Sequence, residues 1–536
     1  MPSPTISPHP PGPVEPRRPP TLPASILFRP DDRPDLGAAG ALPSFAIDLH
    51  LDEVVAALGH DRADPGLGAR YFTRLRDPDA VAFRHEVFRD LEVPGLRDGL
   101  ADFVARMGVV DEHLAHASAI GHPLERQRWQ LEAASAYRAA VAAVAATLDD
   151  ASPVSRGLTA FRAGLRAYVD SEAFTSIVAD TARMLADLAD VTYRLRIDEN
   201  QILVTRHDGE ADYGAEVLAT FGRFRRSGTP EPVSVDVFRT VDMNLVEIGI
   251  LERVARLHPA VFQSLGAYNQ RHGAFVDPAV AVFAGELSFY LGWLDLIRPL
   301  QEAGLPFSYP DVSSGDDGLA ARGLFDLALA IRRVAIGDGI VTNDLDLSPT
   351  ERLIVITGPN QGGKTTFARA IGQLHHLAAI GVPVPGSGAR VLLGPATHTL
   401  FARAEDPADL TGRLEAELTR VSAILDELRP GSVVIMNESF ASTTVDDALA
   451  LNRAVIAEMA RGGAICVVVT FLTELAMDDP GTVSMTGVMD PLDPTRPTYR
   501  LERRPADPLA HARAVADMHG LGYDAVRARI VGRADR

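Results

Sequence analysis

The chain has 536 residues, of which 46% are hydrophobic and 23% charged, proportions that exclude a wholly disordered or collagen-like chain. Its single cysteine, Cys466, excludes an internal disulfide framework and a multi-cysteine metal site. The 52 basic and 71 acidic residues give a net charge of −19, so the chain as a whole is not attracted to nucleic acid or to an anionic membrane. Because we find neither a signal peptide nor an apolar run of about 18 residues, we expect a cytoplasmic protein without a membrane partner.

The first of three predicted domains is a tail, residues 1–34. It contains twelve prolines and almost no apolar periodicity. This composition predicts a disordered or polyproline-like segment.

The second predicted domain, residues 35–320, is mostly helical. Asp77 followed by Pro78 is a helix start signal, and heptad-like apolar spacing predicts a long helix over residues 171–197. Residues 201–205 then read as a strand, with Asp208-Gly209 as a turn signal, before a further helix over residues 280–300. The pattern predicts a helical core with an arm that is interrupted by a small β element.

The third predicted domain, residues 321–536, has an α/β pattern. Apolar, β-branched runs at residues 352–357, 432–436 and 464–470 alternate with helical stretches. Buried strands that alternate with helices predict a mostly parallel sheet.

Lys364 is the only lysine in the sequence, and the other 51 basic residues are arginines. Arginine is a broad planar fork, whereas lysine carries a compact ammonium. A single retained lysine therefore indicates a site that accepts only the smaller cation, unless its survival is chance.

The neighbours of Lys364 favour a phosphate-binding loop. Residues 358–365 fit the pattern G-x-x-x-x-G-K-S/T without a mismatch, after a predicted strand and before a predicted helix. The glycines allow backbone N–H groups to surround phosphates, Lys364 would reach the terminal phosphates of ATP, and the Thr365 hydroxyl would bind Mg²⁺. The candidate ATP-binding residues in this run are Gly358, Pro359, Asn360, Gln361, Gly362, Gly363, Lys364, Thr365 and Thr366.

The second α/β strand ends in Asn437-Glu438. In P-loop ATPases this strand end usually carries an aspartate that holds Mg²⁺ through water, followed by a glutamate that activates the attacking water. Glu438 is therefore the candidate catalytic base. Asn437 has no charge, so we expect it to be a weaker Mg²⁺ partner and hydrolysis to be slow.

The run from Gly358 to Phe367 resembles the phosphate loop of the MutS family, the DNA mismatch-repair ATPases. The stretch 341–347 is similar to the segment that leads into that family's ATPase strand. Further resemblances are the signature segment at residues 405–425, the loop at residues 443–447 and the closing segment near residue 520.

The resemblance implies an ABC-type P-loop ATPase domain behind a helical core with a lever and clamp. It also implies a two-fold homodimer with composite ATP sites on a DNA-encircling clamp, and it places Asn343 near the nucleotide. The sequence departs from the family at Gly412, where a signature serine is usual, and at Phe471, where a histidine is usual. The chain starts at the core domain, so we expect no direct mismatch reading.

A basic cluster at Arg223, Arg225 and Arg226, with interleaved phenylalanines, is the candidate DNA contact. A solvated arm, or a patch that pairs with the acidic surface of the protein, explains the same cluster slightly better. Two functions therefore stay open: an ATPase that drives a clamp on DNA for repair or recombination, or a nucleotide-gated scaffold that hydrolyses little ATP and recruits a protein partner.

Overall fold

The computed structural model describes residues 22–32, 42–59, 65–198, 201–207, 209, 243–315, 318–402, 412–477, 481–490, 492–493, 496–505, 521, 523, 526 and 527. Contacts divide the chain into two compact units. Unit 1 holds Pro94–Pro153 and Leu158–Ala284, and unit 2 holds Ser25–Val93, Val154–Gly157 and the chain from Gly285 onward. The predicted boundary at residue 320 does not coincide with this division, because residues 25–93 and 285–320 pack with the C-terminal half.

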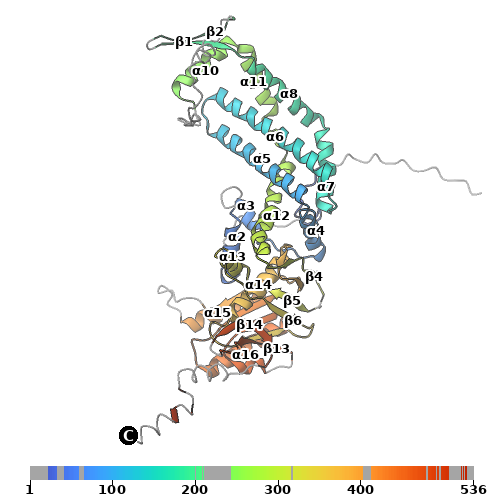
Figure 1. The fold of residues 1–536 in the computed structure, drawn as a ribbon, viewed down its shortest axis with the longest axis vertical. Coiled ribbons are helices and arrows are strands. Elements are labelled where there is room, and N and C mark those ends of the chain that lie inside the picture. Colours follow the sequence, from blue (N-terminus) through green and yellow to red (C-terminus); the bar gives the residue numbers. More distant parts are fainter. Residues whose placement is uncertain are drawn as a thin grey trace, which may run out of the picture. The chain divides into compact units, whose positions relative to one another are not determined.

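Unit 1 is built from long helices that run side by side (Figure 1). Their ends are fixed by local signals: Ser171 Oγ accepts a hydrogen bond from the Phe174 N–H at the start of α8, and Asn244 and Glu247 form a capping box at the start of α10. The helices are α5 (Pro94–Ala119), α6 (Pro123–Ala151), α7 (Arg156–Val169), α8 (Glu172–Ala189), α10 (Leu245–Leu257), α11 (Pro259–His272) and the start of α12 (Pro278–Glu302).

The helix predicted over residues 171–197 is wrong over its last eight residues, 190–197. It ends at Ala189, and the chain continues as β1 (Tyr193–Asp198), which pairs antiparallel with β2 (Gln201–Arg206). Leu195, which falls inside the predicted helix, lies opposite Val204 in this hairpin. Cross-strand pairing of apolar and β-branched residues outweighs the helical spacing there. The β element itself is confirmed.

Unit 2 contains a six-stranded sheet in the order β10-β11-β12-β7-β13-β14. Neighbouring strands are parallel except for the antiparallel edge strand β14, which confirms the predicted mostly parallel sheet. Its strands are β7 (Leu353–Thr357), β10 (Thr397–Phe401), β11 (Val433–Asn437), β12 (Ile465–Val469), β13 (Thr482–Met489) and β14 (Pro497–Arg503).

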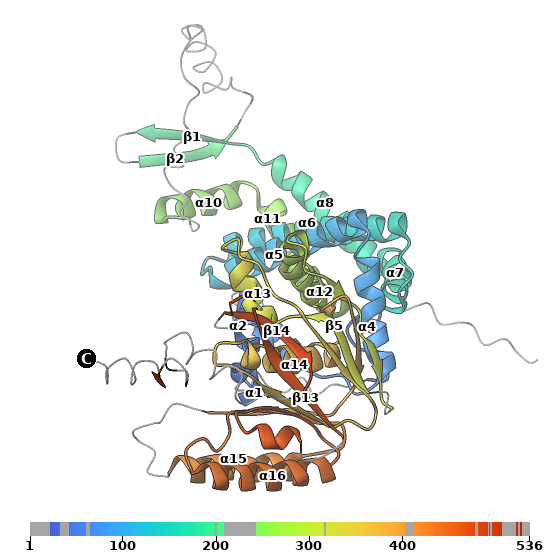
Figure 2. The same ribbon diagram turned by 60° about the horizontal axis from the view of Figure 1, so that its bottom comes forward.

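Helices cover both faces of this sheet (Figure 2). Helix α14 (Lys364–Ala379) lies on one face, and α15 (Arg413–Glu427) and α16 (Val445–Arg461) lie on the other. Strands β11 and β12 are accordingly buried along almost their whole length, and Cys466 is buried within β12 as predicted. This layered α/β architecture fixes the strand ends that carry the candidate site.

The rest of unit 2 surrounds this core. A second sheet has the order β4-β9-β5-β6, and β3 pairs with β8. The remaining elements are α1 (Ser44–Asp48), α2 (Leu51–Ala57), α3 (Pro65–Arg70), α4 (Pro78–Asp90), β3 (Phe307–Ser308), β4 (Asp311–Ser313), β5 (Leu319–Leu324), α13 (Leu327–Val334), β6 (Asn343–Leu347), β8 (Val384–Pro385), β9 (Gly388–Leu392) and the 3₁₀ turn η1 (Thr473–Ala476).

A short part of the predicted tail packs against the rest of unit 2, which corrects the assignment as disordered for residues 25–28. Ile26, Leu27 and Phe28 are all at least nine-tenths buried. Glu286 of α12 accepts hydrogen bonds from Ser25 Oγ and the Ile26 N–H, both at 2.6 Å. The prolines dominate the composition of residues 1–34, but this short apolar run is enough to attach its end to the core.

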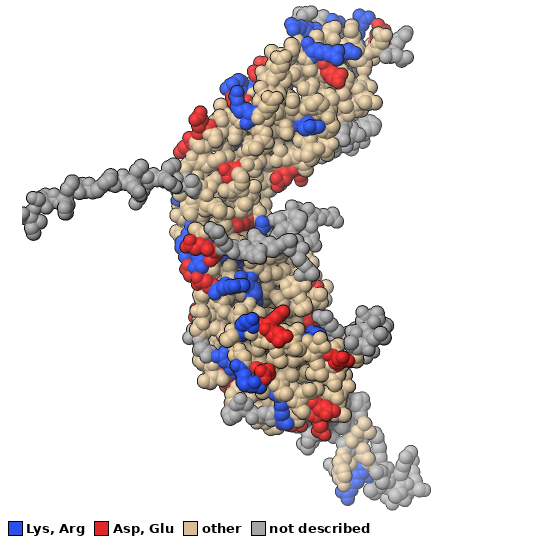
Figure 3. Space-filling model, turned by 180° about the vertical axis from the view of Figure 1, so that it is seen from behind, with Lys and Arg blue, Asp and Glu red and all other residues tan. Residues whose placement is uncertain are grey.

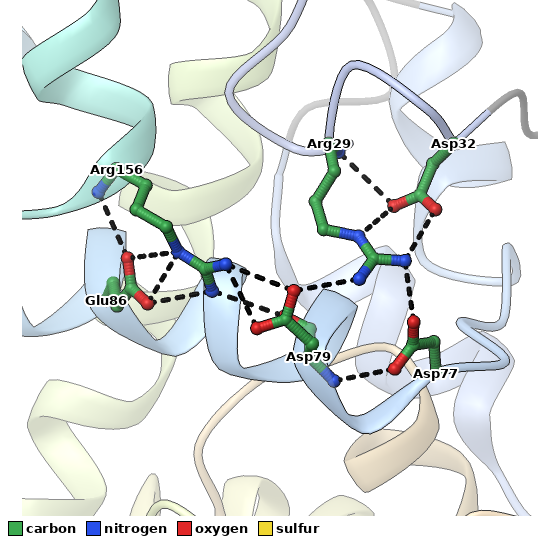
Figure 4. Close-up of polar contacts among 6 residues, drawn as sticks. All are labelled: Arg29, Asp32, Asp77, Asp79, Glu86 and Arg156. Carbon is green, nitrogen blue, oxygen red and sulfur yellow. Dashed lines mark hydrogen bonds and ion pairs between the residues drawn. The ribbon is translucent and has the colours of Figure 1, made fainter. Parts of the chain in front are cut away.

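Ion pairs hold the same segment against α4 (Figure 4). Arg29 bonds Asp32 at 2.9 Å, and both Asp77 and Asp79 at 2.8 Å, while Arg156 bonds Asp79 at 3.0 Å. The hydrogen bonds from these guanidinium groups lower the pKa values of the Asp32 and Asp79 carboxyls. Asp77 also caps α4, as its position before Pro78 predicted.

Helix α12 is long and apolar enough to cross a membrane by length and composition. We predicted this helix over residues 280–300, but the expectation that no apolar run approaches the length of a membrane span was wrong. Of its most apolar stretch, 61% is buried within the protein, as in the core helix of a folded domain.

Candidate functional site

Three parallel strands of unit 2 bring their carboxyl ends to the same edge of the sheet. The phosphate-loop sequence follows β7, Asn437 ends β11, and Phe471 comes shortly after β12. In open α/β sheets this edge is where ligands bind. This edge of the sheet therefore brings together the phosphate-loop sequence, Asn437 and Phe471.

The loop between β7 and α14 has the backbone of an anion cradle. Gly358 and Gly363 have φ angles of 132° and 88°, in the region that favours glycine, and Gln361 also has a positive φ of 60°. A Cβ atom at Gly358 would lie 3.0 Å from the Gly487 nitrogen. Helix α14 starts at Lys364, so its first backbone N–H groups lack intrahelical partners and can bind an anion.

Lys364 is buried at the start of this helix, with only 5% of its surface exposed. Its ammonium donates hydrogen bonds to the Gly358 carbonyl at 2.9 Å and the Pro359 carbonyl at 3.0 Å. Burial lowers the pKa of Lys364, and the negative charge of Glu438 partly opposes that shift. The only lysine of the chain is thus held inside the loop.

Thr365 and Asn437, the two residues that we predicted to bind Mg²⁺, lie 72 positions apart in the sequence but are in direct contact in the structure. The Thr365 hydroxyl donates a hydrogen bond to Asn437 Oδ1 at 2.9 Å. Both groups offer oxygen atoms, the ligand type that Mg²⁺ prefers, and Mg²⁺ usually takes few protein ligands besides water and phosphate. The donor set fits that ion, although within the described ranges no group of three or more His, Cys, Asp or Glu could hold a metal.

Glu438 follows at the end of β11 with a left-handed backbone, φ 51°. Its N–H donates to the Val469 carbonyl at 2.9 Å, which ties the residue to the neighbouring strand β12. A non-glycine residue in this conformation is held by its surroundings, often at a functional site.

A cavity of about 380 Å³ opens beside the loop. It is lined by loop residues 360–366, by Glu438 and by residues that the sequence analysis missed. Tyr499 of β14, whose backbone has a φ of 60°, lines the cavity and lies 3.7 Å from a Cβ built at Gly363. No motif marks Tyr499, because it reaches the loop only through the antiparallel pairing of β13 and β14.

Asn343, predicted to lie near the nucleotide, also lines the cavity. Its side-chain amide is bound to the backbone of β14, however: Oδ1 accepts from the Leu501 N–H at 2.7 Å and Nδ2 donates to the Tyr499 carbonyl at 3.1 Å. Asn343 therefore positions the strand that carries Tyr499.

The other residues that we singled out are spread over several places. Gly412 is the exposed N-cap of α15, and it does not line the cavity. Arg223, Arg225 and Arg226 lie outside the described residues, so the structure does not place the candidate DNA contact. On the face seen in Figure 3, basic and acidic side chains are interspersed.

Comparisons with known proteins agree with this geometry. Residues 354–488, from β7 to β13, match the family model of MutS domain V. The chain is 32% identical to Endonuclease MutS2 of Thermomicrobium roseum over 193 residues, which cover 35% of this chain and 24% of that protein. The chain thus matches about a quarter of the length of this relative.

The strand–loop–helix with its buried lysine is set in a helix-covered parallel sheet, which is the setting in which the motif G-x-x-x-x-G-K-S/T is expected. The two matches support the resemblance to the MutS family that the sequence motifs had indicated. They lie in the C-terminal part of the chain, where residues 354–488 match MutS domain V, the ATPase domain of that family.

Proposed function

We propose that unit 2 binds ATP with Mg²⁺ and hydrolyses it. The observation that carries this proposal is the hydrogen bond between Thr365 and Asn437 beside the buried Lys364 ammonium. Two oxygen atoms, one compact cation and the first backbone N–H groups of α14 lie together at the phosphate loop. Together they match the charge distribution of a metal-bound triphosphate.

Each residue has a separate role in this proposal. The loop amides and Lys364 hold the terminal phosphates, and Thr365 and Asn437 hold Mg²⁺, which would neutralise phosphate charge when bound. Glu438 accepts the proton of the attacking water. Tyr499 lines the same cavity next to Gly363, and we assign its aromatic surface to the nucleoside end of the ligand.

A calorimetric titration with ATP and Mg²⁺ tests the proposal. Wild-type protein should bind, and Lys364→Met should weaken binding at least about tenfold, because it removes a charge-assisted contact to phosphate. Arg461→Met is a matched control, since Arg461 is a largely exposed surface cation that pairs with Glu458. Failure of the wild type to bind adenine nucleotide would overturn the proposal.

For the whole molecule we propose a homodimeric ATPase of DNA repair or recombination, in which ATP closes composite sites and changes the state of a DNA clamp. The match of residues 354–488 to MutS domain V and the similarity to Endonuclease MutS2 support this proposal. Salt-dependent binding to duplex and branched DNA, with and without ATP, tests it, because phosphate contacts predict a steep loss of affinity as salt rises.

A second candidate is a nucleotide-gated scaffold that hydrolyses little ATP and recruits a protein partner. The uncharged Asn437 at the metal position and the net charge of −19 favour it. A Glu438→Gln variant separates the two candidates: loss of ATP turnover supports the ATPase, whereas an unchanged background rate supports the scaffold.

A further inference from the structure

Phe471, which stands where the MutS resemblance leads us to expect a histidine, lies against the ammonium of Lys364. The Lys364 Nζ atom is 4.4 Å from the centre of the phenyl ring. Phe471 follows the carboxyl end of β12, 107 positions after Lys364 in the sequence, but β12 pairs directly with β7 in the sheet. The contact is therefore made by the fold and not by a local motif.

The surroundings of the ammonium leave little free hydrogen-bonding capacity. A lysine ammonium has three N–H donors. Two of them serve the Gly358 and Pro359 carbonyls, and the face of the Phe471 ring lies next to the same group. A ring face attracts a cation through its quadrupole, most strongly where water is excluded, and Lys364 is almost fully buried.

We propose that Phe471 is an aromatic latch that competes with the terminal phosphates of the nucleotide for Lys364. This inference rests on the proposed function of the site. A phosphate that takes a hydrogen bond from the ammonium must displace the ring from it. The ring can leave at little cost to the core, because 53% of Phe471 is exposed.

Because of the latch, the length of a ligand's phosphate chain determines whether Phe471 affects its binding. Ligands that reach the ammonium, such as ATP and pyrophosphate, must displace the ring, whereas AMP does not extend that far along the loop. A phenyl group also donates no hydrogen bond to phosphate. Phe471 therefore weakens triphosphate binding selectively and makes it depend on movement of the segment after β12.

The single lysine allows a direct measurement of the contact. Protein labelled with ¹³C and ¹⁵N only in lysine should give a single set of lysine side-chain signals, that of Lys364. In the wild type the ring should shift the Lys364 Hε resonances upfield. We expect this shift to disappear in Phe471→Leu, and on addition of ATP or pyrophosphate to the wild type.

Binding of ATP, pyrophosphate and AMP to the same proteins gives the second test. Phe471→Leu keeps an apolar side chain but lacks the ring, so ATP and pyrophosphate should bind about three- to thirtyfold more tightly, with AMP unchanged. Met477→Leu is the matched control, because Met477 is 73% exposed a few residues further along and does not line the cavity. Thermal unfolding of each variant shows that it is folded.

The outcomes separate the latch from the function on which it rests. Tighter binding of ATP to Phe471→Leu than to the wild type supports the latch. If both proteins bind ATP equally, or if the Lys364 signal is the same in both, the latch is refuted while ATP binding stands. If neither protein binds ATP or pyrophosphate, both proposals are refuted.

Discussion

The stability of unit 2 should fall as the pH drops below neutral, because it contains buried neutral histidines. His376 of α14 is 1% exposed, and its ring packs against Phe45 and Phe72. Nε2 donates to the Tyr71 carbonyl at 2.9 Å, and Nδ1 has no hydrogen-bond partner in the described part of the chain. Burial lowers the pKa of His376 to about 3.

The sign and size of the effect follow from this shift. In the unfolded chain a histidine has a pKa near 6.5. Below that pH the unfolded state therefore binds a proton that the folded state does not bind. The stabilisation is complete above about pH 7 and is lost as the pH falls from about 6.5 towards 3. Between pH 7 and 5.5 the loss is about 1.2 kcal/mol per histidine.

His376→Gln tests this reasoning by denaturant unfolding over the same pH range. Glutamine can still donate to the Tyr71 carbonyl but does not titrate, so the free energy of unfolding should depend less steeply on pH, by about 1.2 kcal/mol across the interval. His207→Gln, at an exposed position after β2, controls for the loss of one histidine. An unchanged pH slope in His376→Gln would refute the claim that His376 is buried and neutral.

Three further predictions concern the core and the candidate site. Glu286→Gln should lower the free energy of unfolding by about 1–3 kcal/mol, because it removes the charge from the acceptor of Ser25 and the Ile26 N–H; equal unfolding midpoints in denaturant would contradict this. Tyr499→Ala should weaken binding of ATP and AMP alike, roughly fivefold, and leave pyrophosphate binding unchanged, because the aromatic surface contacts the nucleoside. If calorimetry shows weaker pyrophosphate binding as well, Tyr499 lies at the phosphates instead. Asn437→Asp should lower the Mg²⁺ concentration that half-saturates ATP binding by about tenfold, because a charge replaces a neutral amide beside the Thr365 hydroxyl; no change in the Mg²⁺ titration would separate Asn437 from the metal.

The sequence predicted those parts of unit 2 that depend on a continuous stretch of chain. The phosphate loop is such a part, since its glycines, its lysine and the start of α14 lie within eight residues. The core strands β7, β11 and β12 were recognised for the same reason, as runs of apolar and β-branched residues. Parallel strands then place their carboxyl ends together, so even the proximity of Thr365 and Asn437 followed from the pattern.

The sequence was insufficient where contacts with another segment decide the local structure. The helix stripe predicted over residues 171–197 broke at Ala189 because β2 offers β1 a pairing partner. Ile26, Leu27 and Phe28 are ordered because Glu286, some 260 positions later, accepts the backbone N–H groups of Ile26 and Leu27. Their own proline-rich surroundings gave no sign of that acceptor.

The sequence by itself therefore determined which chemical groups unit 2 brings to the candidate site: the backbone amides of the loop, one ammonium, a hydroxyl, an amide and a carboxylate. Only the tertiary structure decided what else touches them, namely the Phe471 ring against Lys364 and Tyr499 beside the loop. The physical reason is that a loop motif fixes its own backbone, whereas contacts across a sheet depend on strand order and register, which no short stretch of sequence specifies.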